Sequence, residues 1–224
     1  ALRQPYARHV AGSPMTTARS AYLLLISLLS GALPALADDL NHGKTLFGAC
    51  SSCHGEQAQG NWTLAAPALA GQAQSYLMRQ LDNFKTGLRG SHPADSAGAQ
   101  MRAIVATLPD EQAIADLSAY LASLPIATIT PSLSGNVALG SRLYQAKCGA
   151  CHGGQAEGNL AMHSPRLRQQ FDSYLLLQVN HFKQGIRGNA PSDRYGKQMK
   201  MMASSVNETE LLDVLAYISS LSQP

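Results

Sequence analysis

Apolar residues recur at helical spacing towards the end of the sequence. Leu211, Leu215 and Ile218 lie three or four positions apart, and Val214 and Leu221 share their face. This spacing places an apolar stripe along one side of a helix, where it can be buried against other elements. An equivalent stripe occurs in the first half of the chain: Ile114, Leu117, Leu121 and Leu124.

Polar residues mark where these two helices begin. Asp110 and Asn207 are typical N-cap residues, and Glu210 completes a capping-box pattern with Asn207. Helical patterns also cover four earlier segments, two of which end at a glycine, Gly87 or Gly185. These segments are residues 40–48, 73–86, 137–146 and 171–184. Since no stretch alternates with period two, the sequence predicts an all-α fold.

The chain contains an internal repeat. The pentapeptide Cys-Ser-Ser-Cys-His at residues 50–54 recurs as Cys-Gly-Ala-Cys-His at residues 148–152, 98 positions later. At this offset, 25 of the 59 positions from 50 to 108 are identical. Because this period is too long for a solenoid repeat, we expect two tandem domains, residues 38–124 and 136–224. The uncharged segment 125–135 has a proline at each end of its first half and is expected to be an extended linker.

The first 37 residues are predicted to be a leader. Met15 is followed by Arg19, an apolar run over residues 21–33 and an Ala-Leu-Ala sequence at residues 35–37. This is the layout of a secretory signal peptide. The apolar run is shorter than the roughly 18 residues of a membrane span, although an uncleaved anchor is the alternative. Residues 1–14 precede a plausible start methionine, and we expect the mature protein to lack them.

Removing this leader changes the charge balance. The full sequence has 17 Lys plus Arg against 14 Asp plus Glu. The leader accounts for three arginines and no acid, so 14 residues of each sign remain. Such a balance does not indicate a nucleic-acid-binding protein. Four cysteines are also too few for a disulfide scaffold.

All four cysteines lie in the two repeated pentapeptides: Cys50, Cys53, Cys148 and Cys151. In an exported chain, C-x-x-C-H is typical of haem c attachment, in which both thiols bond to the porphyrin and the histidine ligates iron. The histidines here are His54 and His152. A zinc site would separate its cysteine pairs by about 15–20 residues, and a thioredoxin-like motif would need a βαβ context. The sequence therefore predicts two covalently attached haem c groups.

The repeat also indicates which methionines complete the iron coordination. Met101 and Met199 match each other, and each follows its histidine by 47 positions. Met201 and Met202 are alternatives to Met199. Ligation by histidine and methionine saturates the iron and raises its reduction potential. We therefore expect electron transfer, with no chemistry on a substrate and no catalytic residue.

With these motifs, the chain from residue 38 onward resembles the dihaem class I cytochromes c of the c4 type. It shares a Gly-x-Arg-Gly segment at residues 87–90 and 185–188, and a later Gln-Met at 100–101 and 198–199. The resemblance implies two cytochrome c domains, each of three to four helices around a haem, related by a pseudo-twofold axis. It implies propionates near each other at the interface. It also implies that the carbonyl of a proline, here Pro67 and Pro165, orients each proximal histidine.

Four repeated polar residues are candidates for propionate contacts: Arg89, Arg187, Tyr76 and Tyr174. Buried propionates would require hydrogen-bond donors of this kind. The alternative is that these residues lie at solvated helix ends.

The resemblance implies a periplasmic carrier that transfers electrons between a quinol-oxidising or other donor complex and a terminal oxidase or reductase. Its partners would then be redox proteins, with peripheral membrane association through a partner complex. A dihaem subunit of a dehydrogenase, such as flavocytochrome sulfide dehydrogenase, is the alternative. A dihaem peroxidase would need an open iron, which the matched methionines argue against. The two halves also differ in charge, with a balance of −3 over residues 38–131 and +3 over residues 132–224, and this polarity could orient docking.

Overall fold

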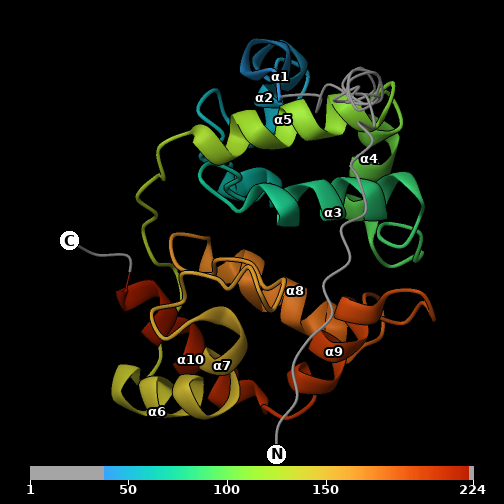
Figure 1. Cartoon of the computed structure of the whole chain (residues 1–224). Coiled ribbons are helices and arrows are strands. Elements are labelled where there is room, and N and C mark those ends of the chain that lie inside the picture. The colour runs from blue at the N-terminus through green and yellow to red at the C-terminus, as the bar shows by residue number, and fades with distance from the viewer. Residues whose placement is uncertain (1–37, 222–224) are drawn as a thin grey trace, which may run out of the picture. The chain divides into compact units, whose positions relative to one another are not determined.

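The computed structural model describes residues 38–221 (Figure 1). The leader predicted over residues 1–37 lies outside this range, as do the last three residues. Within it, no helix has the length and apolar character needed to cross a membrane.

The described residues form two similar sets of helices. Each set has four helices of eight residues or more and one single-turn helix. The first comprises α1 (Leu40–Phe47), α2 (Ser51–His54), the 3-10 helix η1 (Trp62–Leu64), α3 (Gln74–Lys85), α4 (Ser96–Val105) and α5 (Glu111–Ser123). The second comprises α6 (Val137–Lys147), α7 (Gly149–His152), α8 (Asp172–Lys183), α9 (Arg194–Ala203) and α10 (Glu208–Ser220). The all-α prediction is confirmed, since extended pairing in this part of the chain is limited to two isolated bridges.

The expected helix boundaries have clear physical causes. The Asp110 side chain accepts a hydrogen bond from the backbone N–H of Ala113 at the start of α5. Asn207 and Glu210 form the reciprocal capping box of α10. Beyond α3 and α8, Gly87 and Gly185 adopt positive φ angles of 79° and 73°, which favour glycine.

Helices α4 and α9 were not expected from the sequence, although they carry the candidate methionines. In α9, Tyr195, Met199 and Met202 share one face at helical spacing, and this short apolar face was missed; α4 has a weaker pattern. Each begins at an aspartate whose side chain accepts a hydrogen bond from a glycine N–H three residues later, at 2.9 Å for Asp95 and 2.8 Å for Asp193. This Asp-x-x-Gly pattern recurs in both halves and was the available signal.

Each set of helices is held by a close crossing between its first and last helix. A glycine on the first helix lies against the backbone of the last one, so that a side chain would clash there. Gly43 of α1 meets the carbonyl of Asp116 in α5, and Gly140 of α6 meets the carbonyl of Asp213 in α10. The apolar stripes predicted for α5 and α10 are buried, with Ile114 at 1% and Leu215 at 2% exposure.

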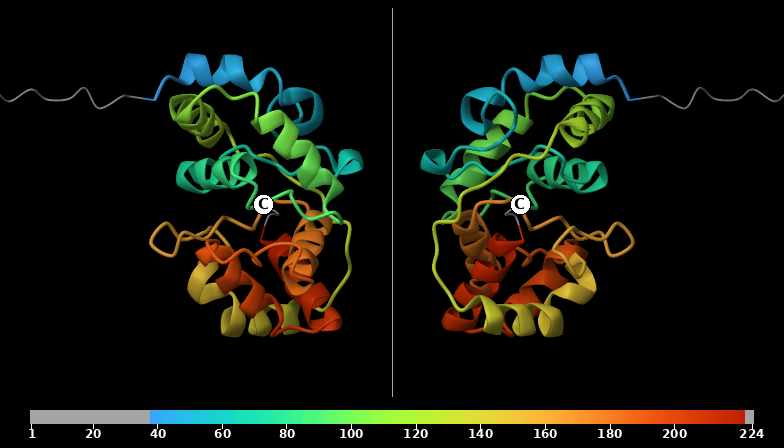
Figure 2. Two further views of the ribbon diagram at one scale, coloured as in Figure 1. Left: turned by 90° about the vertical axis from the view of Figure 1, so that its right-hand side faces the viewer. Right: turned by 90° about the vertical axis from the view of Figure 1, so that its left-hand side faces the viewer.

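Helices α3 and α8 lie next to each other where the two sets meet, as the views in Figures 1 and 2 show. Residues 125–136, which connect the sets, have no regular secondary structure. Asp172, at the start of α8, accepts hydrogen bonds from the backbone N–H groups of Ser132 and Leu133 at 2.7 Å. The end of the connection is therefore fixed to the second set.

Candidate functional site

Each cysteine pair and its histidine lie on a single helical turn. His54 donates its backbone N–H to the carbonyl of Cys50 at 2.9 Å, and His152 does the same to Cys148 at 3.0 Å. Residues spaced by three and four positions share one side of a helix, so the first cysteine of each pair lies beside both the second cysteine and the histidine. In the second half, Cys148, Cys151 and His152 line one cavity. Gly55 and Gly153, with φ angles of 78° and 84°, then turn the chain away.

The two histidines have the same environment. His54 Nδ1 lies 2.9 Å from the carbonyl oxygen of Pro67, and His152 Nδ1 lies 3.0 Å from that of Pro165. A carbonyl only accepts, so Nδ1 carries the proton and Nε2 of the neutral ring keeps its lone pair. Burial lowers the pKa of both imidazoles, while the bond to the proline carbonyl opposes this shift. The structure thus holds each ring in the form that ligates a metal.

Burial also keeps the first cysteine of each pair neutral. It raises the pKa of the Cys148 thiol to about 11, and it raises that of Cys50, where Cys53 adds to the effect.

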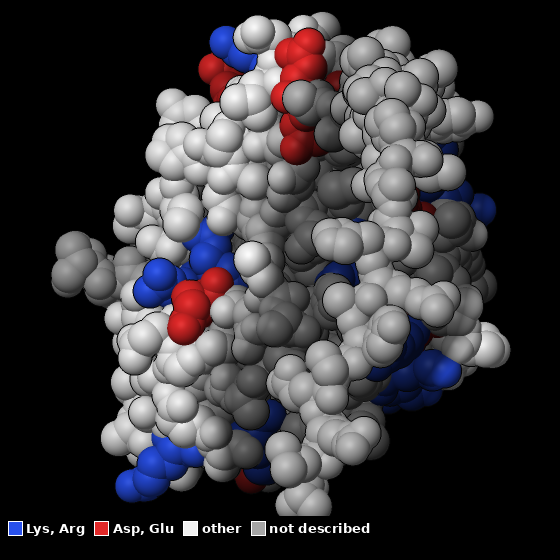
Figure 3. Space-filling view, in the orientation of Figure 1, with Lys and Arg blue, Asp and Glu red and all other residues white. Residues whose placement is uncertain are grey.

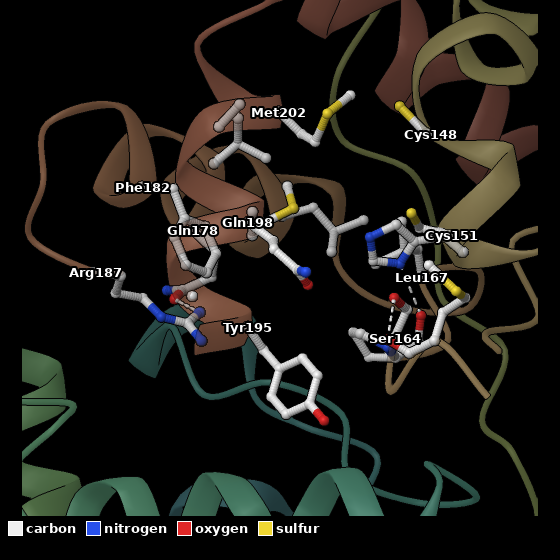
Figure 4. Close-up of a pocket in the computed structure, with 18 of the residues that line it drawn as sticks. Cys148, Cys151, Ser164, Leu167, Gln178, Phe182, Arg187, Tyr195, Gln198 and Met202 are labelled. Carbon is white, nitrogen blue, oxygen red and sulfur yellow. Dashed lines mark hydrogen bonds between the residues drawn. The ribbon is translucent and has the colours of Figure 1, made fainter. Parts of the chain in front are cut away.

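A large apolar cavity opens beside α7 (Figure 4). Cys148 and Cys151 lie on one side of it, with Phe182 and Arg187 on the opposite side. Apolar side chains from α8 and α10 form much of its wall: Leu175, Val179, Leu211, Val214, Leu215 and Ile218. Part of the wall comes from the other half of the chain, through Tyr76, Arg79, Gln80 and Asn83 of α3.

The candidate methionines differ in their exposure and in whether they line this cavity. Met199 and Met202 of α9 both line this cavity together with His152. Met201 is 67% exposed and does not line it. In the first half, Met101 of α4 is half-buried and packs against the core that includes Phe47 and Cys50.

The repeated arginines and tyrosines meet between α3 and α8. Arg89 donates to Tyr174 Oη at 3.4 Å and to Gln178 Oε1 at 3.2 Å, both across the interface. Arg187 donates to Gln80 Oε1 at 3.1 Å, also across it. The two arginines therefore do not lie at solvated helix ends, which was the alternative.

These two arginines are buried, each with 8% exposure. Each guanidinium lies over a phenylalanine ring of its own half, 4.4 Å from the centroid of Phe84 or Phe182. Each also has an Nε atom without a hydrogen-bond partner. Burial lowers the pKa of Arg187, and the charge of Arg89 adds to this effect. Two adjacent buried cations make this cluster a site for anionic groups.

Two glutamine pairs were missed in the sequence: Gln80 with Gln178, and Gln72 with Gln170. All four are among the positions that match between the halves. The signal was therefore present, but glutamine alone does not point to a chemistry. The first pair bridges the arginines, and the second contacts the segments that follow Pro67 and Pro165.

Taken together, the donor set fits covalently attached haem. Each half offers two thiols and one imidazole with a free Nε2, and methionine sulfurs line the same cavity in the second half. The fold and site define a two-domain c-type cytochrome. Comparison with known proteins agrees: the cytochrome c family model matches residues 40–125 and again residues 137–222, and the chain belongs to this family.

Three similar proteins match most of the chain. Cytochrome c4 of Azotobacter vinelandii is 29% identical over 213 residues, covering 88% of this chain and 96% of that protein. The thiosulfate dehydrogenase electron acceptor of Stutzerimonas stutzeri strain A1501 is 32% identical over 185 residues, covering 78% and 80%. The crystal structure of reduced recombinant cytochrome c4 from Pseudomonas stutzeri matches with a TM-score of 0.63 at 26% identity, covering 81% of this chain and 98% of that one. The chain is thus a dihaem electron-transfer cytochrome of the c4 type, with two haem c groups.

Proposed function

We propose that this protein is a periplasmic electron carrier whose two irons are each held by one histidine and one methionine. The ligands would be His54 with Met101 and His152 with Met199. The observation that supports this most strongly is the matched pair of His–Pro hydrogen bonds, which leaves one Nε2 lone pair free in each half. When bound, two haem c groups supply reversible one-electron chemistry.

The cysteines would anchor the two groups. Cys50 and Cys53 would bond the first haem covalently, and Cys148 and Cys151 the second. The one-turn helices α2 and α7 hold each pair on the same side as its histidine, so the attachment and the ligation are built from a single rigid turn. Pro67 and Pro165 would fix the orientation of the imidazole rings.

Arg89, Arg187, Tyr76 and Tyr174 would receive the propionates at the interface. Their support is the buried pair of guanidinium groups, whose unpartnered Nε atoms require an acceptor. Removing such a cation destabilises the reduced state, which carries the extra negative charge. Arg187→Gln should therefore lower the potential of the second haem in a redox titration, and an unchanged potential would exclude this contact.

Two classes of donor are consistent with the family. A quinol-oxidising complex that feeds a terminal oxidase or reductase is the first. The second is a thiosulfate dehydrogenase, which the similarity to the Stutzerimonas stutzeri acceptor protein favours. If the protein were instead a dihaem subunit of a dehydrogenase, its electron donor would also be a dehydrogenase, as in this second class.

Stopped-flow reduction of the purified holoprotein separates these functions. The protein is mixed in turn with a quinol-oxidising complex plus quinol, and with a thiosulfate dehydrogenase plus thiosulfate. Rapid reduction by only one system identifies the donor class. Slow reduction by both, combined with turnover of peroxide, would contradict a carrier function.

A further inference from the structure

One peptide group in each half makes two hydrogen bonds that point in opposite directions. The carbonyl of Pro67 accepts from His54 Nδ1 at 2.9 Å. The N–H of the same peptide group, which belongs to Ala68, donates to Gln170 Oε1 at 3.0 Å. Gln170 comes from the other domain and lies just before α8. The proximal histidine of the first domain is therefore connected to a side chain of the second through a single peptide group.

The second half repeats this arrangement in the reverse direction. The carbonyl of Pro165 accepts from His152 Nδ1 at 3.0 Å, and the N–H of Arg166 donates to Gln72 Oε1 at 3.0 Å. Gln72 belongs to the first domain and lies just before α3. The two connections thus cross the interface reciprocally.

Each glutamine is held in place by a second bond to the same residue. Gln72 Nε2 donates to the carbonyl of Arg166 at 3.0 Å, and Gln170 Nε2 donates to the carbonyl of Ala68 at 2.9 Å. Because one side of each amide faces a donor and the other an acceptor, the amide orientation is determined. Gln72 is buried with 6% exposure, whereas Gln170 is half-buried.

These contacts have an electronic consequence. An acceptor at a peptide N–H polarises the group and makes its carbonyl oxygen more negative. A more negative carbonyl strengthens the bond from imidazole Nδ1–H and raises the basicity of the ligating nitrogen. A more basic ligand favours the oxidised iron, so each glutamine lowers a reduction potential.

We propose that Gln72 and Gln170 are cross-domain positioning residues, each tuning the haem bound in the domain opposite to its own. This inference rests on the proposed ligation by His54 and His152. It makes the potential of each haem depend on whether the two domains are docked. Because Gln72 is the more buried of the two, its effect on the second haem should be the larger.

The test uses two holoprotein variants, Gln72→Met and Gln170→Met, which keep similar side-chain volume but remove both hydrogen bonds that cross between the domains. Potentiometric titration with optical detection should show a raised potential for the second haem in Gln72→Met and for the first haem in Gln170→Met. The expected change is roughly two- to tenfold in the equilibrium constant for reduction. Each variant is the control for the other.

A third variant shows which of the two reduction steps (waves) in the titration belongs to which haem. Met101→His should lower the potential of the first haem strongly, because methionine ligation raises it. If neither wave moved, ligation by Met101 would be refuted, which is a failure of the proposed function and not of the glutamine inference.

A conservative variant distinguishes an effect on the reduction potential from a purely structural role of the glutamine. Gln170→Glu keeps an acceptor for the Ala68 N–H, so the first haem should stay at or below its original potential. The inference is overturned if the Met variants lose thermal stability while both potentials stay unchanged, or if either Met variant shifts both waves equally.

Discussion

Met199 and Met202 are both placed where they could ligate the second iron. Both line the cavity beside His152. Only Met199 has a counterpart at the same distance from the histidine in the first half, and Met202 is 38% exposed. Met199 is therefore the better candidate, and Met201, pointing to solvent, is the weakest.

Substituting the two methionines separately distinguishes them. Met199→Leu should remove the thioether ligand from one iron and reduce the sulfur–iron charge-transfer absorbance of the oxidised protein by about half. Met202→Leu should leave it unchanged. The reverse result would assign the ligand to Met202.

At the level of single residues, the sequence supports a prediction where a chemistry requires fixed spacing. The cysteines and histidines follow from the pentapeptide, because thioether attachment and ligation impose that order. The glutamines at positions 72 and 170 could not be assigned a role in the same way, since their contacts lie 94 and 102 positions away along the chain. Such partners depend on how the two domains dock.

At the level of the helices, the close crossings of α1 with α5 and of α6 with α10 determine each domain. The apolar periodicity of α5 and α10 was visible in the sequence because each of these helices has one deeply buried face. Helices α4 and α9 were not predicted, because the apolar pattern of α4 is weak and the apolar face of α9 is short; the Asp cap at the start of each was the clearer signal. Met101 and Met199 were thus selected as candidate ligands only because they match each other in the repeat.

Gly140→Ala tests the crossing of α6 and α10. The added methyl group would meet the backbone carbonyl of Asp213, which cannot move without shifting α10. Overpacking of this kind costs about 1–3 kcal/mol, so urea unfolding of the holoprotein should show that loss. Gly154→Ala is the matched control in the same domain, because no atom lies within 4 Å of the added group. Equal stability of both variants would contradict the close crossing.

A buried carboxylate joins α1 to α5 and makes stability depend on pH. Asp116 accepts from the backbone N–H of Asp39 at 2.8 Å and contacts His42 Nδ1 at 2.7 Å. These contacts, led by the Asp39 N–H, hold the pKa of Asp116 below its ordinary value. The stabilisation is therefore complete above the unfolded pKa of about 4 and is lost as the pH falls through the lower folded pKa.

Asp116→Asn should remove this dependence. Hydrogen bonds to charged groups contribute about 1.5–3 kcal/mol, so the variant should be less stable by roughly that amount at pH 7 and should differ less from wild type near pH 3. Unfolding by urea at both pH values measures the difference. Asp110→Asn, which keeps an N-cap residue, is the control, and a pH-independent deficit in Asp116→Asn would rule out the electrostatic explanation.

At the scale of the molecule, the two halves differ in charge while sharing one fold. Figure 3 shows acidic side chains over the first domain and most of the visible Lys and Arg over the second. This matches the balances of −3 and +3 counted along the sequence. The sequence could not show that buried arginines of both domains form one cluster at the interface, because these contacts depend on how the two domains dock.

The interface connects the two sites in three ways. Residues of α3 line the cavity of the second domain, the arginines exchange hydrogen bonds between α3 and α8, and the glutamines reach the peptide groups that hold the proximal histidines. The two domains are therefore joined at their sites by hydrogen bonds in both directions, and the cavity of the second domain is partly built by the first.

A potentiometric titration of the holoprotein with optical detection tests the central claim most directly. We expect two one-electron steps from two low-spin haems, with spectra that do not change when carbon monoxide is added to the reduced protein. A high-spin component, or ready binding of carbon monoxide at either iron, would show an open coordination position and contradict histidine–methionine ligation at both sites.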